Sequence, residues 1–447
     1  MIAMEVKYKK TGIDWMPIVP EHWDIVRLKW VLKNGEGIKI GPFGSSLKLQ
    51  DLDNNGIRVY GQENVIKDDF SLGKRFLSKE KFEELSVYEV FPQDILVTMM
   101  GTTGKCKLVP DDAEKGIMDS HLIRLRANDK IRPEFLSILI NDSKQLKYQM
   151  SIDSKGSIMS GLNSKIVKNL LLPLPSINDQ DLILKKIKTE SAQISRFLQS
   201  KQSFIELLKE QRQSIITHAV TKGIDENVKM KETGIDWMPE VPEHWEVRKI
   251  RRIFNGISSG TTPESGNLKY YENGYVNWIN TGDLNDNTLT GCKYKVTKKA
   301  LDDYPTLKIY PSGAVLVAMY GATIGKVSLL EIEGCTNQAC CALYDSDIYS
   351  KEFSLYSILA SKDALIRESY GGGQPNISQD VIKRFKLPVP PTEEQKQIVE
   401  FIKSETRTLD IAINKAEREI ELMKEYREAM IAEAVTGKKI VNSHISG

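Results

Sequence analysis

The stretch TGIDWMPIVPEHW at residues 11–23 returns as TGIDWMPEVPEHW at residues 233–245, with a single difference between Ile18 and Glu240. The two copies begin about half a chain length apart in a sequence of 447 residues. This period is far longer than the ~20–50 residues of a solenoid unit. The sequence therefore predicts two domain-sized halves with two similar surfaces, an arrangement suited to a target that has two parts.

Composition is that of an ordinary globular chain, with 40% hydrophobic and 27% charged residues. The formal net charge of +2 neither requires nor excludes a polyanionic partner, because Lys and Arg can gather on one face. The N-terminal MIAMEVKYKK has no apolar segment, and no stretch approaches the ~18 apolar residues of a membrane span. We expect a cytoplasmic protein with no membrane partner.

The five cysteines show no C-x-x-C spacing, and none of the five histidines lies near a cysteine at the spacing of metal ligands. We therefore predict no metal site and no disulfide framework. The adjacent Cys340 and Cys341 are expected to pack as small apolar core residues rather than to react.

Each half reads as a compact domain of mixed α/β character. A strand-like apolar run leads into a Gly/Thr turn, GTTGK or GATIGK; a helical stretch follows, and the domain closes on a proline pair, LPLP or LPVP. In the first half the apolar run spans residues 94–100, the turn 101–105, the helical stretch 133–149 and the proline pair 172–175. In the second half the same features span residues 314–320, 321–326, 351–369 and 387–390.

After each proline pair the sequence predicts one long helix, because Pro and Gly are absent from Asp179 to Val220 and from Thr392 to Val435. Apolar residues recur there at intervals of seven, with further apolar residues four positions after some of them. This spacing is typical of a helix that packs along another helix. Thr392 with Gln395 fits a capping box. Ser176 is a further N-cap candidate, and Gly223 and Gly437 mark the expected ends. The predicted seam consists of Ile187, Ile194, Leu198, Ile205, Leu208, Ile215, Ile402, Leu409, Ile413, Ile420, Met423 and Met430.

If the two halves are related by a twofold axis, the second helix must run back along the first. The predicted fold is thus α+β, with two mixed α/β domains at opposite ends of an antiparallel helix pair and a pseudo-twofold internal repeat. The alternative is two separate amphipathic helices, each lying on its own domain. The predicted boundaries are 1–178 and 223–391 for the domains, 179–222 and 392–437 for the helices, and 438–447 for a C-terminal tail.

The order T-G-I-x-W-x-P-x-x-P-x-H-W, domain, P-x-P and long helix, followed by all of it again, resembles the specificity subunit of type I restriction–modification systems. The resemblance covers nearly the whole chain, and GATIGK and the run from Gln374 through LPVP to Gln395 are further specific elements. The first domain departs from the pattern, because GTTGK is one residue shorter and residues 160–164 lack the Gln-Pro-Asn-Ile-Ser run.

The resemblance implies that each domain is a target-recognition domain reading half of a bipartite site in double-stranded DNA. It also implies that the helices set the spacing and dock two methyltransferase subunits, with restriction subunits completing the complex. S-adenosylmethionine and ATP are then expected on the partner subunits only, with no cofactor on this chain.

The turns do not form a phosphate loop of the NTPase type. Such a loop has four residues between its glycines and then Gly-Lys-Ser/Thr, whereas Cys106 and Val327 follow the lysines here. No methyltransferase, nuclease or cofactor motif is evident, so we predict a subunit that is not an enzyme.

The turns could instead contact DNA phosphates through backbone N–H groups, hydroxyls and a lysine. We assign Lys105, Lys326, Thr102 and Thr323 to this role as a hypothesis. The alternative is that each lysine is simply a solvated residue on a tight hairpin.

Base reading requires side chains that match base edges: Arg or Lys for guanine, Asn or Gln for adenine, Ser or Thr for either. Polar clusters at expected loop positions are candidates, although Ser and Asn also serve turn geometry alone. They are Ser45, Ser46, Lys48, Gln62, Asn64, Ser258, Ser259, Thr261, Thr262, Asn280, Thr281, Gln374 and Asn376.

Trp23 and Trp245 are expected to fasten the chain entry onto the core, with a methyltransferase-binding surface as the alternative. Three other functions stay open from sequence: a self-contained enzyme, a coiled-coil adaptor without sequence preference, and a specificity subunit of a modification-only or type II-like system.

Overall fold

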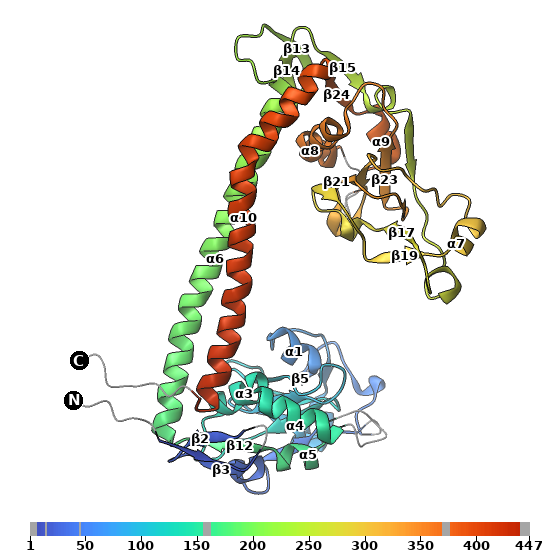
Figure 1. Ribbon diagram of the computed structural model, residues 1–447. Coiled ribbons are helices and arrows are strands. Elements are labelled where there is room, and N and C mark those ends of the chain that lie inside the picture. Colours follow the sequence, from blue (N-terminus) through green and yellow to red (C-terminus); the bar gives the residue numbers. More distant parts are fainter. Residues whose placement is uncertain (1–6, 14–15, 44–45, 155–161, 369–375, 439–447) are drawn as a thin grey trace, which may run out of the picture. The chain divides into compact units, whose positions relative to one another are not determined.

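The computed structural model describes residues 7–13, 16–43, 46–154, 162–368 and 376–438. The chain divides into two compact units. The first unit comprises Met1–Ser200 and Glu419–Gly447, and the second comprises Lys201–Arg418. Each unit contains one α+β domain and a stretch of both long helices (Figure 1).

Two long helices, α6 over Ile177–Lys222 and α10 over Thr392–Val435, follow the proline pairs. Because no Pro or Gly interrupts them, their backbone hydrogen-bond ladders continue unbroken. Each ends just before a glycine with positive φ, 79° at Gly223 and 75° at Gly437, as expected for a C-terminal stop. No helix of the described residues combines the length and hydrophobicity that a membrane span requires.

The two helix starts differ in their capping. Ser176 caps α6, since its Oγ accepts the N–H of Asp179 at 3.2 Å. Thr392 is already helical, and the carbonyl of Pro391 accepts the N–H of Gln395 at 3.0 Å. The predicted capping box at Thr392 is therefore wrong, because the side chain of Gln395 bonds to other groups.

Within each unit, segments of α6 and α10 pack together. In the first unit, Ile187 and Ile194 share an apolar cluster with Met430. In the second unit, Lys209 Nζ lies 3.0 Å from Glu417 Oε1, and Arg212 Nε lies 2.7 Å from Asp410 Oδ1. Numbers on α10 fall as those on α6 rise, so these segments are antiparallel. All twelve predicted seam residues are buried or half-buried.

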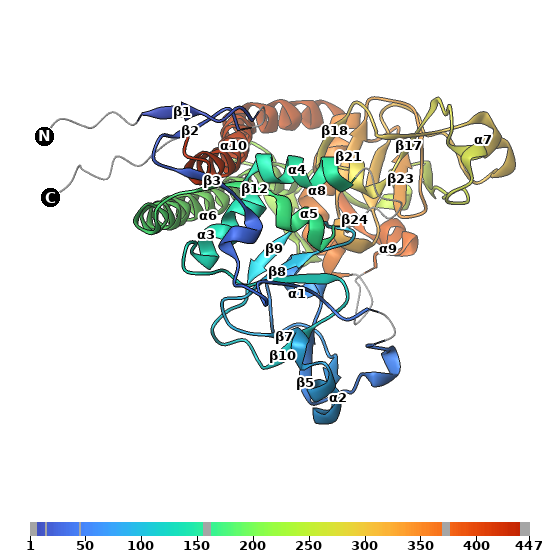
Figure 2. The ribbon, with the colours of Figure 1, turned by 90° about the horizontal axis from the view of Figure 1, so that it is seen from below.

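The first domain contains two four-stranded sheets. Its elements are β1 Tyr8–Lys10, β2 Ile18–Pro20, β3 Asp24–Arg27, β4 Ile38–Ile40, β5 Ile57–Tyr60, β6 Phe76–Leu77, β7 Glu89–Val90, β8 Ile95–Thr98, β9 Cys106–Leu108, β10 Gly116–Met118, β11 Leu122–Leu125, β12 Leu171–Leu174, α1 Gln62–Lys67, α2 Lys79–Glu84, α3 Pro133–Asp142, α4 Lys144–Ser154 and α5 Ser164–Asn169. The sheet orders are β6-β5-β10-β7 and β4-β11-β8-β9, with smaller pairs β1-β2 and β12-β3. Strands β8 and β11 are wholly buried, because some of their side chains pack with apolar residues of α3 and others, Leu96 and Leu122, belong to a second apolar cluster. Figure 2 shows α3, α4 and α5 on one side of β8 and β9, with β5, β7 and β10 on the other.

The second domain contains a five-stranded and a three-stranded sheet. Its elements are β13 Met230–Ile235, β14 Met238–Pro242, β15 Glu246–Lys249, β16 Gly256–Ser259, β17 Val276–Ile279, β18 Asn287–Leu289, β19 Tyr294–Val296, β20 Val315–Ala318, β21 Val327–Leu330, β22 Cys335–Thr336, β23 Cys340–Tyr344, β24 Lys386–Val389, α7 Lys298–Asp303, α8 Lys351–Arg367 and α9 Gln379–Arg384. The orders are β16-β23-β20-β21-β18 and β19-β17-β22, with smaller pairs β13-β14 and β15-β24. Cys340 and Cys341 are buried in β23, as predicted for core residues.

Equivalent strands pair in the same way in the two domains, which fixes the places that correspond. A parallel pair sets Tyr60 opposite Met118 in the first domain and Ile279 opposite Thr336 in the second. The helices that follow differ: α8 is one helix, whereas α3 and α4 are separated at Ser143. The two halves are therefore similar in their sheets and differ more in this helical layer.

A buried glutamine joins the start of each long helix to its domain. In the first unit, Gln180 Oε1 accepts the N–H of Arg132 at 2.7 Å, and its Nε2 donates to the carbonyls of Lys130 and Pro175, both at 3.0 Å. The side chain is completely buried. One amide thus satisfies three backbone groups where the helix, the segment before α3 and the proline pair meet.

Gln395 repeats this joint in the second unit. Its Oε1 accepts the N–H of Ser350 at 2.9 Å, and its Nε2 donates to the carbonyls of Ile348 at 2.8 Å and Pro390 at 3.0 Å. It is also completely buried. The same three connections are therefore made in both units.

The duplicated opening segment covers helix ends. Trp23 and Trp245 are at most 1% exposed. A Cβ added to Gly437 would lie 2.8 Å from the Trp23 ring, and one added to Gly223 would lie 3.3 Å from the Trp245 ring. Each tryptophan thus packs against the glycine that ends a long helix. This agrees with the structural role predicted for them; Trp15 lies outside the described residues.

The neighbouring histidines contact the start of the other long helix. His22 Nε2 lies 3.2 Å from Asp179 Oδ2, and His244 Nε2 lies 2.8 Å from Glu394 Oε2. Each copy of the segment therefore touches both helices of the pair, one at its end and one at its beginning.

Replacing Gln395 with leucine should loosen this joint. The substitution leaves the N–H of Ser350 and two carbonyls buried without partners, which costs about 3 kcal/mol. Hydrogen exchange at residues 348–355 should then accelerate by roughly 100-fold. Gln397→Leu, two residues along on the exposed face, is the matched control. Equal exchange rates in the two variants would show that the joint is not what holds this segment.

Candidate nucleic-acid interface

In the first domain, loops that follow several strands gather at one edge of the sheets. The N–H of Met99 donates to the carbonyl of His121 at 2.9 Å, and the N–H of Asp119 donates to that of Tyr60 at 2.8 Å. A Cβ at Gly41 would lie 1.8 Å from the carbonyl oxygen of Asp119, so the loop after β4 also touches this edge. The loops after β4, β5, β8 and β10 therefore lie together.

The second domain repeats the arrangement. The N–H of Met319 donates to the carbonyl of Ala339 at 2.8 Å, and that of Asn337 donates to Ile279 at 3.3 Å. A Cβ at Gly260 would lie 1.7 Å from the last carbonyl oxygen of β22. The loops after β16, β17, β20 and β22 thus form the equivalent edge.

Polar side chains at these edges are exposed or half-buried. We name two sets. The first rim is Gln62, Thr102, Thr103, Ser120 and His121, and the second rim is Thr262, Asn280, Thr281, Asn337 and Gln338.

Neutral amides and hydroxyls are linked along the second rim. The hydroxyl of Thr262 donates to Gln338 Oε1 in a short hydrogen bond. Asn337 Nδ2 donates to Asn280 Oδ1 at 3.1 Å. These bonds fix the orientation of side chains that still face solvent, so donors and acceptors are held ready for a partner.

The first rim lies beside a cluster of charged groups. Asp119 Oδ2 accepts from Arg75 Nη1 at 3.0 Å, and Arg75 Nη2 donates to Glu63 Oε1 at 2.8 Å. Asp119 Oδ1 also accepts the N–H of His121 at 3.0 Å. Because Asp119 occupies the place of Asn337, the same scaffold presents different groups in the two domains.

The two Gly/Thr turns adjoin these rims. Gly101 and Gly104 have φ of 66° and 78°, and Gly321 and Gly325 have φ of 80° and 76°. These left-handed conformations account for the glycines in both turns. The glycines therefore serve the turn geometry itself.

The residues predicted to contact phosphate lie in these turns. Thr102 is exposed, while Thr323 and Lys326 are half-buried. Lys105 Nζ donates to the carbonyl of Ile66 at 2.7 Å, which anchors it at the end of α1.

Several of the residues predicted to read bases lie on the rims, and others do not. Gln62, Thr262, Asn280 and Thr281 belong to the rims as defined. Asn64 does not fit, because it is fully buried and bonded to Gly61, Asp69 and Leu72. The predicted Ser45 and Gln374 lie outside the described residues.

The remaining candidates have mixed surroundings. Ser258 and Ser259 lie within β16 rather than in a loop; the former donates to Tyr310 Oη at 3.0 Å, and the latter accepts from Gln379 at 3.4 Å. Thr261 shares a 2.7 Å bond with Thr306. Ser46 and Lys48 follow β4, and Asn376 forms an isolated backbone bridge with Tyr320 beside the second turn.

Sequence reasoning missed Thr103, which lies beside Thr102 in the first turn. It also missed Ser120, His121, Asn337 and Gln338. They lie between β10 and β11 or between β22 and β23, and they join the rims because β10 and β22 pair in parallel with strands far back in the chain. A polar break between two apolar runs, as in CTNQACCALY at residues 335–344, is the local signal that could have found them.

The chemistry of the rims suits the recognition of bases. Asn, Gln, Ser and Thr offer the donors and acceptors that match base edges. Burial raises the pKa of the Cys340 and Cys341 thiols behind the second rim to about 12, so they stay protonated at neutral pH. The described residues contain no cluster of three or more His, Cys, Asp or Glu side chains placed to bind a metal.

Comparisons with known proteins find relatives that agree with one another in kind. The family model described as type I restriction modification DNA specificity domain matches residues 20–207 and 242–422. The type I restriction enzyme MjaVIII specificity subunit of Methanocaldococcus jannaschii is 26% identical, covering 94% of this chain and 93% of the relative. The putative MjaX specificity subunit of the same organism is 24% identical, covering 97% of each.

A solved chain from work on complex assembly and conformational transition of the type I R-M system has a similar fold. Its TM-score is 0.62 at 16% identity, covering 94% of this chain and 99% of that one. At this identity the likeness concerns the fold.

Proposed function

The chain belongs to the family of type I restriction modification DNA specificity domains, and from this premise we propose how its two halves recognise DNA. It is the DNA-recognition subunit of a type I restriction–modification system. In our proposal the first rim reads one half of a bipartite target and the second rim reads the other. The observation that carries this proposal is one loop arrangement, built twice with different side chains.

Gln338 is the residue we propose as an adenine reader in the second half-site. Its Oε1 is held by the Thr262 hydroxyl, which leaves one lone pair of Oε1 and both N–H groups of Nε2 for a partner. An amide in this state can accept from adenine N6 and donate to adenine N7. In the first domain the same place holds Ser120, whose shorter side chain would read a different base pair.

Gln338→Ala should relax recognition at one base pair of the second half-site and leave the first half-site unchanged. Loss of a bidentate contact costs about 1–3 kcal/mol, or roughly 5- to 150-fold in discrimination. Methylome sequencing of cells carrying the variant reads both half-sites at once. Gln397→Ala on α10 should leave the motif intact. A motif that is unchanged, or relaxed in both half-sites, would contradict the assignment.

We also propose that the antiparallel helix pair acts as a ruler, with the domains at opposite ends and related by a pseudo-twofold axis. The antiparallel packing within each unit supports this arrangement. A helix of about 40 residues is about 60 Å long at 1.5 Å per residue. One turn of B-DNA is about 34 Å, so two short elements on one duplex face could be read across an unread spacer.

Inserting one helical turn into both helices should lengthen the spacer without altering either half-site. Suitable positions are the unit borders, between Ser200 and Lys201 in α6 and between Arg418 and Glu419 in α10. Four residues add about 6 Å, or about two base pairs. Methylome sequencing measures the spacer directly. Altered half-sites with an unchanged spacer would disprove the ruler.

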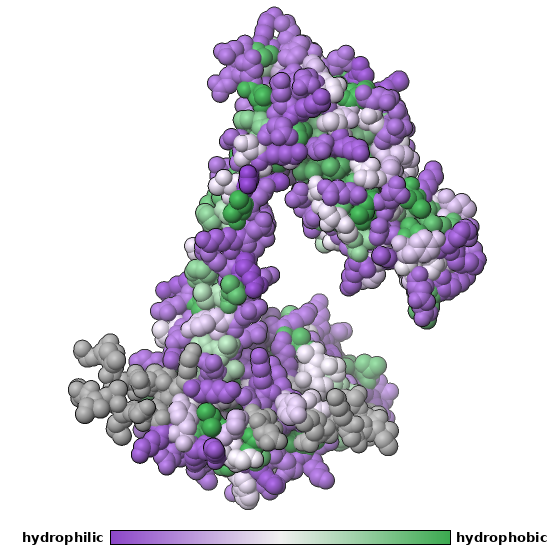
Figure 3. Space-filling model, viewed as in Figure 1, coloured by the Kyte–Doolittle hydropathy of each residue, from purple (hydrophilic) through white to green (hydrophobic). Residues whose placement is uncertain are grey.

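The long helices also offer a surface for methyltransferase subunits, which is our proposal for their docking. Leu207 of α6 and Ile411 of α10 are 63% and 60% exposed, which is unusual for large apolar side chains. Figure 3 shows apolar residues at the surface along the helices. We propose that two methyltransferase subunits bind here, that restriction subunits join them, and that S-adenosylmethionine and ATP bind to those partners.

In this proposal the specificity subunit has no catalytic activity of its own and acts in the cytoplasm, where it meets chromosomal DNA.

Leu207→Ser should weaken binding of the methyltransferase subunit by about tenfold, because a buried apolar contact would be lost. Since Leu207 is exposed, its replacement should leave the fold intact. Glu210→Ser, also exposed on α6, is the control. Calorimetric titration of the purified subunits measures the effect. Equal affinities for the two variants would show that the methyltransferase subunit binds at another surface.

A further inference from the structure

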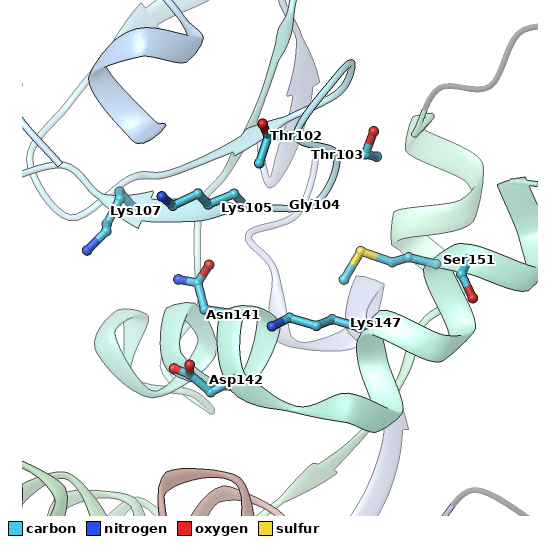
Figure 4. A pocket seen from close by; sticks show the side chains of 10 residues that line it. Thr102, Thr103, Gly104, Lys105, Lys107, Asn141, Asp142, Lys147 and Ser151 are labelled. Carbon is cyan, nitrogen blue, oxygen red and sulfur yellow. The ribbon is translucent and has the colours of Figure 1, made fainter. Parts of the chain in front are cut away.

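A cavity of about 600 Å³ opens in the first domain between the Gly/Thr turn and the helices α3 and α4 (Figure 4). The strand side contributes Lys105 and Lys107, and Lys147 comes from the helix side. The volume falls in the range of small-ligand sites. The other lining residues are Thr102, Thr103, Gly104, Asn141, Asp142, Met150 and Ser151.

Positive charge in this cavity is only partly balanced. Lys107 pairs with Asp68 at 2.5 Å, outside the lining. Lys105 is anchored by a neutral carbonyl, so its charge and two of its N–H groups remain available. The Lys147 side chain is exposed, and its ammonium forms no hydrogen bond or ion pair with any residue that the structure describes.

The one carboxylate in the lining is Asp142. Burial raises its pKa, while the charges of Lys147 and Arg427 act in the opposite direction. Two ammonium groups, Lys105 and Lys147, thus face the cavity against a single, partly buried acid.

The corresponding place in the second domain has different side chains and a paired lysine. There a Cβ on Gly325 would lie 2.7 Å from the Ile366 side chain, and Lys362 Nζ pairs with Asp286 at 2.7 Å. In the first domain the helix breaks at Ser143, and Met150 lies against Gly104 instead. The repeated fold therefore does not require an unpaired lysine at this place.

We propose that this cavity binds a phosphate group, supplied either by the backbone of DNA lying on the first rim or by a free nucleotide. Lys105 and Lys147 supply the charge, the hydroxyls of Thr102 and Thr103 supply short donors, and the Met150 thioether offers an apolar wall for the attached sugar or base. Thr102 and Thr103 belong to both the cavity and the first rim, so a strand held there can reach inside. The DNA form of the proposal rests on the proposed function; the nucleotide form does not.

Two assays on the full-length chain separate the two sources. Binding to a random-sequence duplex over a range of salt concentrations reports phosphate contacts, and calorimetric titration with inorganic tripolyphosphate reports a free ligand. Lys147→Ala is compared with Lys144→Ala, an exposed lysine of the same helix that does not line the cavity.

If DNA supplies the phosphate, Lys147→Ala reduces the slope of log K against log salt by about one, and Lys144→Ala does not. If a free nucleotide supplies it, the slope is unchanged, but saturable tripolyphosphate binding is lost in Lys147→Ala alone. Thr103→Val, which keeps the charge, should weaken tripolyphosphate binding in this second case.

The proposal is overturned if the Lys147 and Lys144 variants match the wild-type chain in both assays. A wild-type chain that shows no preference for any DNA sequence would count against the proposed function, without bearing on the tripolyphosphate result.

Discussion

The hydrogen bonds of one buried glutamine amide connect each recognition domain to a long helix. Gln180 and Gln395 each satisfy a backbone N–H and two carbonyls, at the point where the helix, the segment before α3 or α8 and the proline pair meet. A ruler built from helices can set the spacing of two DNA elements only if each domain is fixed to it. Trp23 and Trp245 complete this attachment by covering the helix-ending glycines. Conservation of these contacts between the two halves explains why the opening segment is nearly identical in both copies.

The proposed recognition requires the side chains of the rims to differ between the two halves. Strand pairing brings the same loops to the same edge in both domains, but Asp119 and Ser120 stand where Asn337 and Gln338 stand in the second. In the proposed recognition, the backbone supplies position and a few exposed side chains supply the choice of base. The helical layer behind the rims differs as well. In the first domain it breaks at Ser143 and borders a lysine-lined cavity, whereas in the second domain Lys362 pairs with Asp286 and Ile366 lies against Gly325.

Periodicity and repetition were enough to predict the long helices, the buried or half-buried seam and the two α/β domains. These features depend on residues close in sequence or on a pattern that occurs twice. The Thr392 capping box was wrong, because the side chain of Gln395 has partners at Ile348, Ser350 and Pro390 that only the tertiary fold brings near. The prediction that Asn64 reads bases fails for a similar reason. A polar side chain suggests an exposed position, but the Asn64 amide is buried and accepts a hydrogen bond from the backbone of Gly61. Gln338 was missed because the parallel pairing of β17 with β22 joins segments distant in the chain.

The most direct test is the N6-methyladenine methylome of the source strain with and without this gene. The account predicts the loss of one motif made of two short elements separated by an unread spacer, with all other motifs unchanged. Loss of a single uninterrupted motif would contradict two rims that read separately. An unchanged methylome, together with purified chain that binds every duplex equally, would contradict the assignment of sequence recognition to this chain.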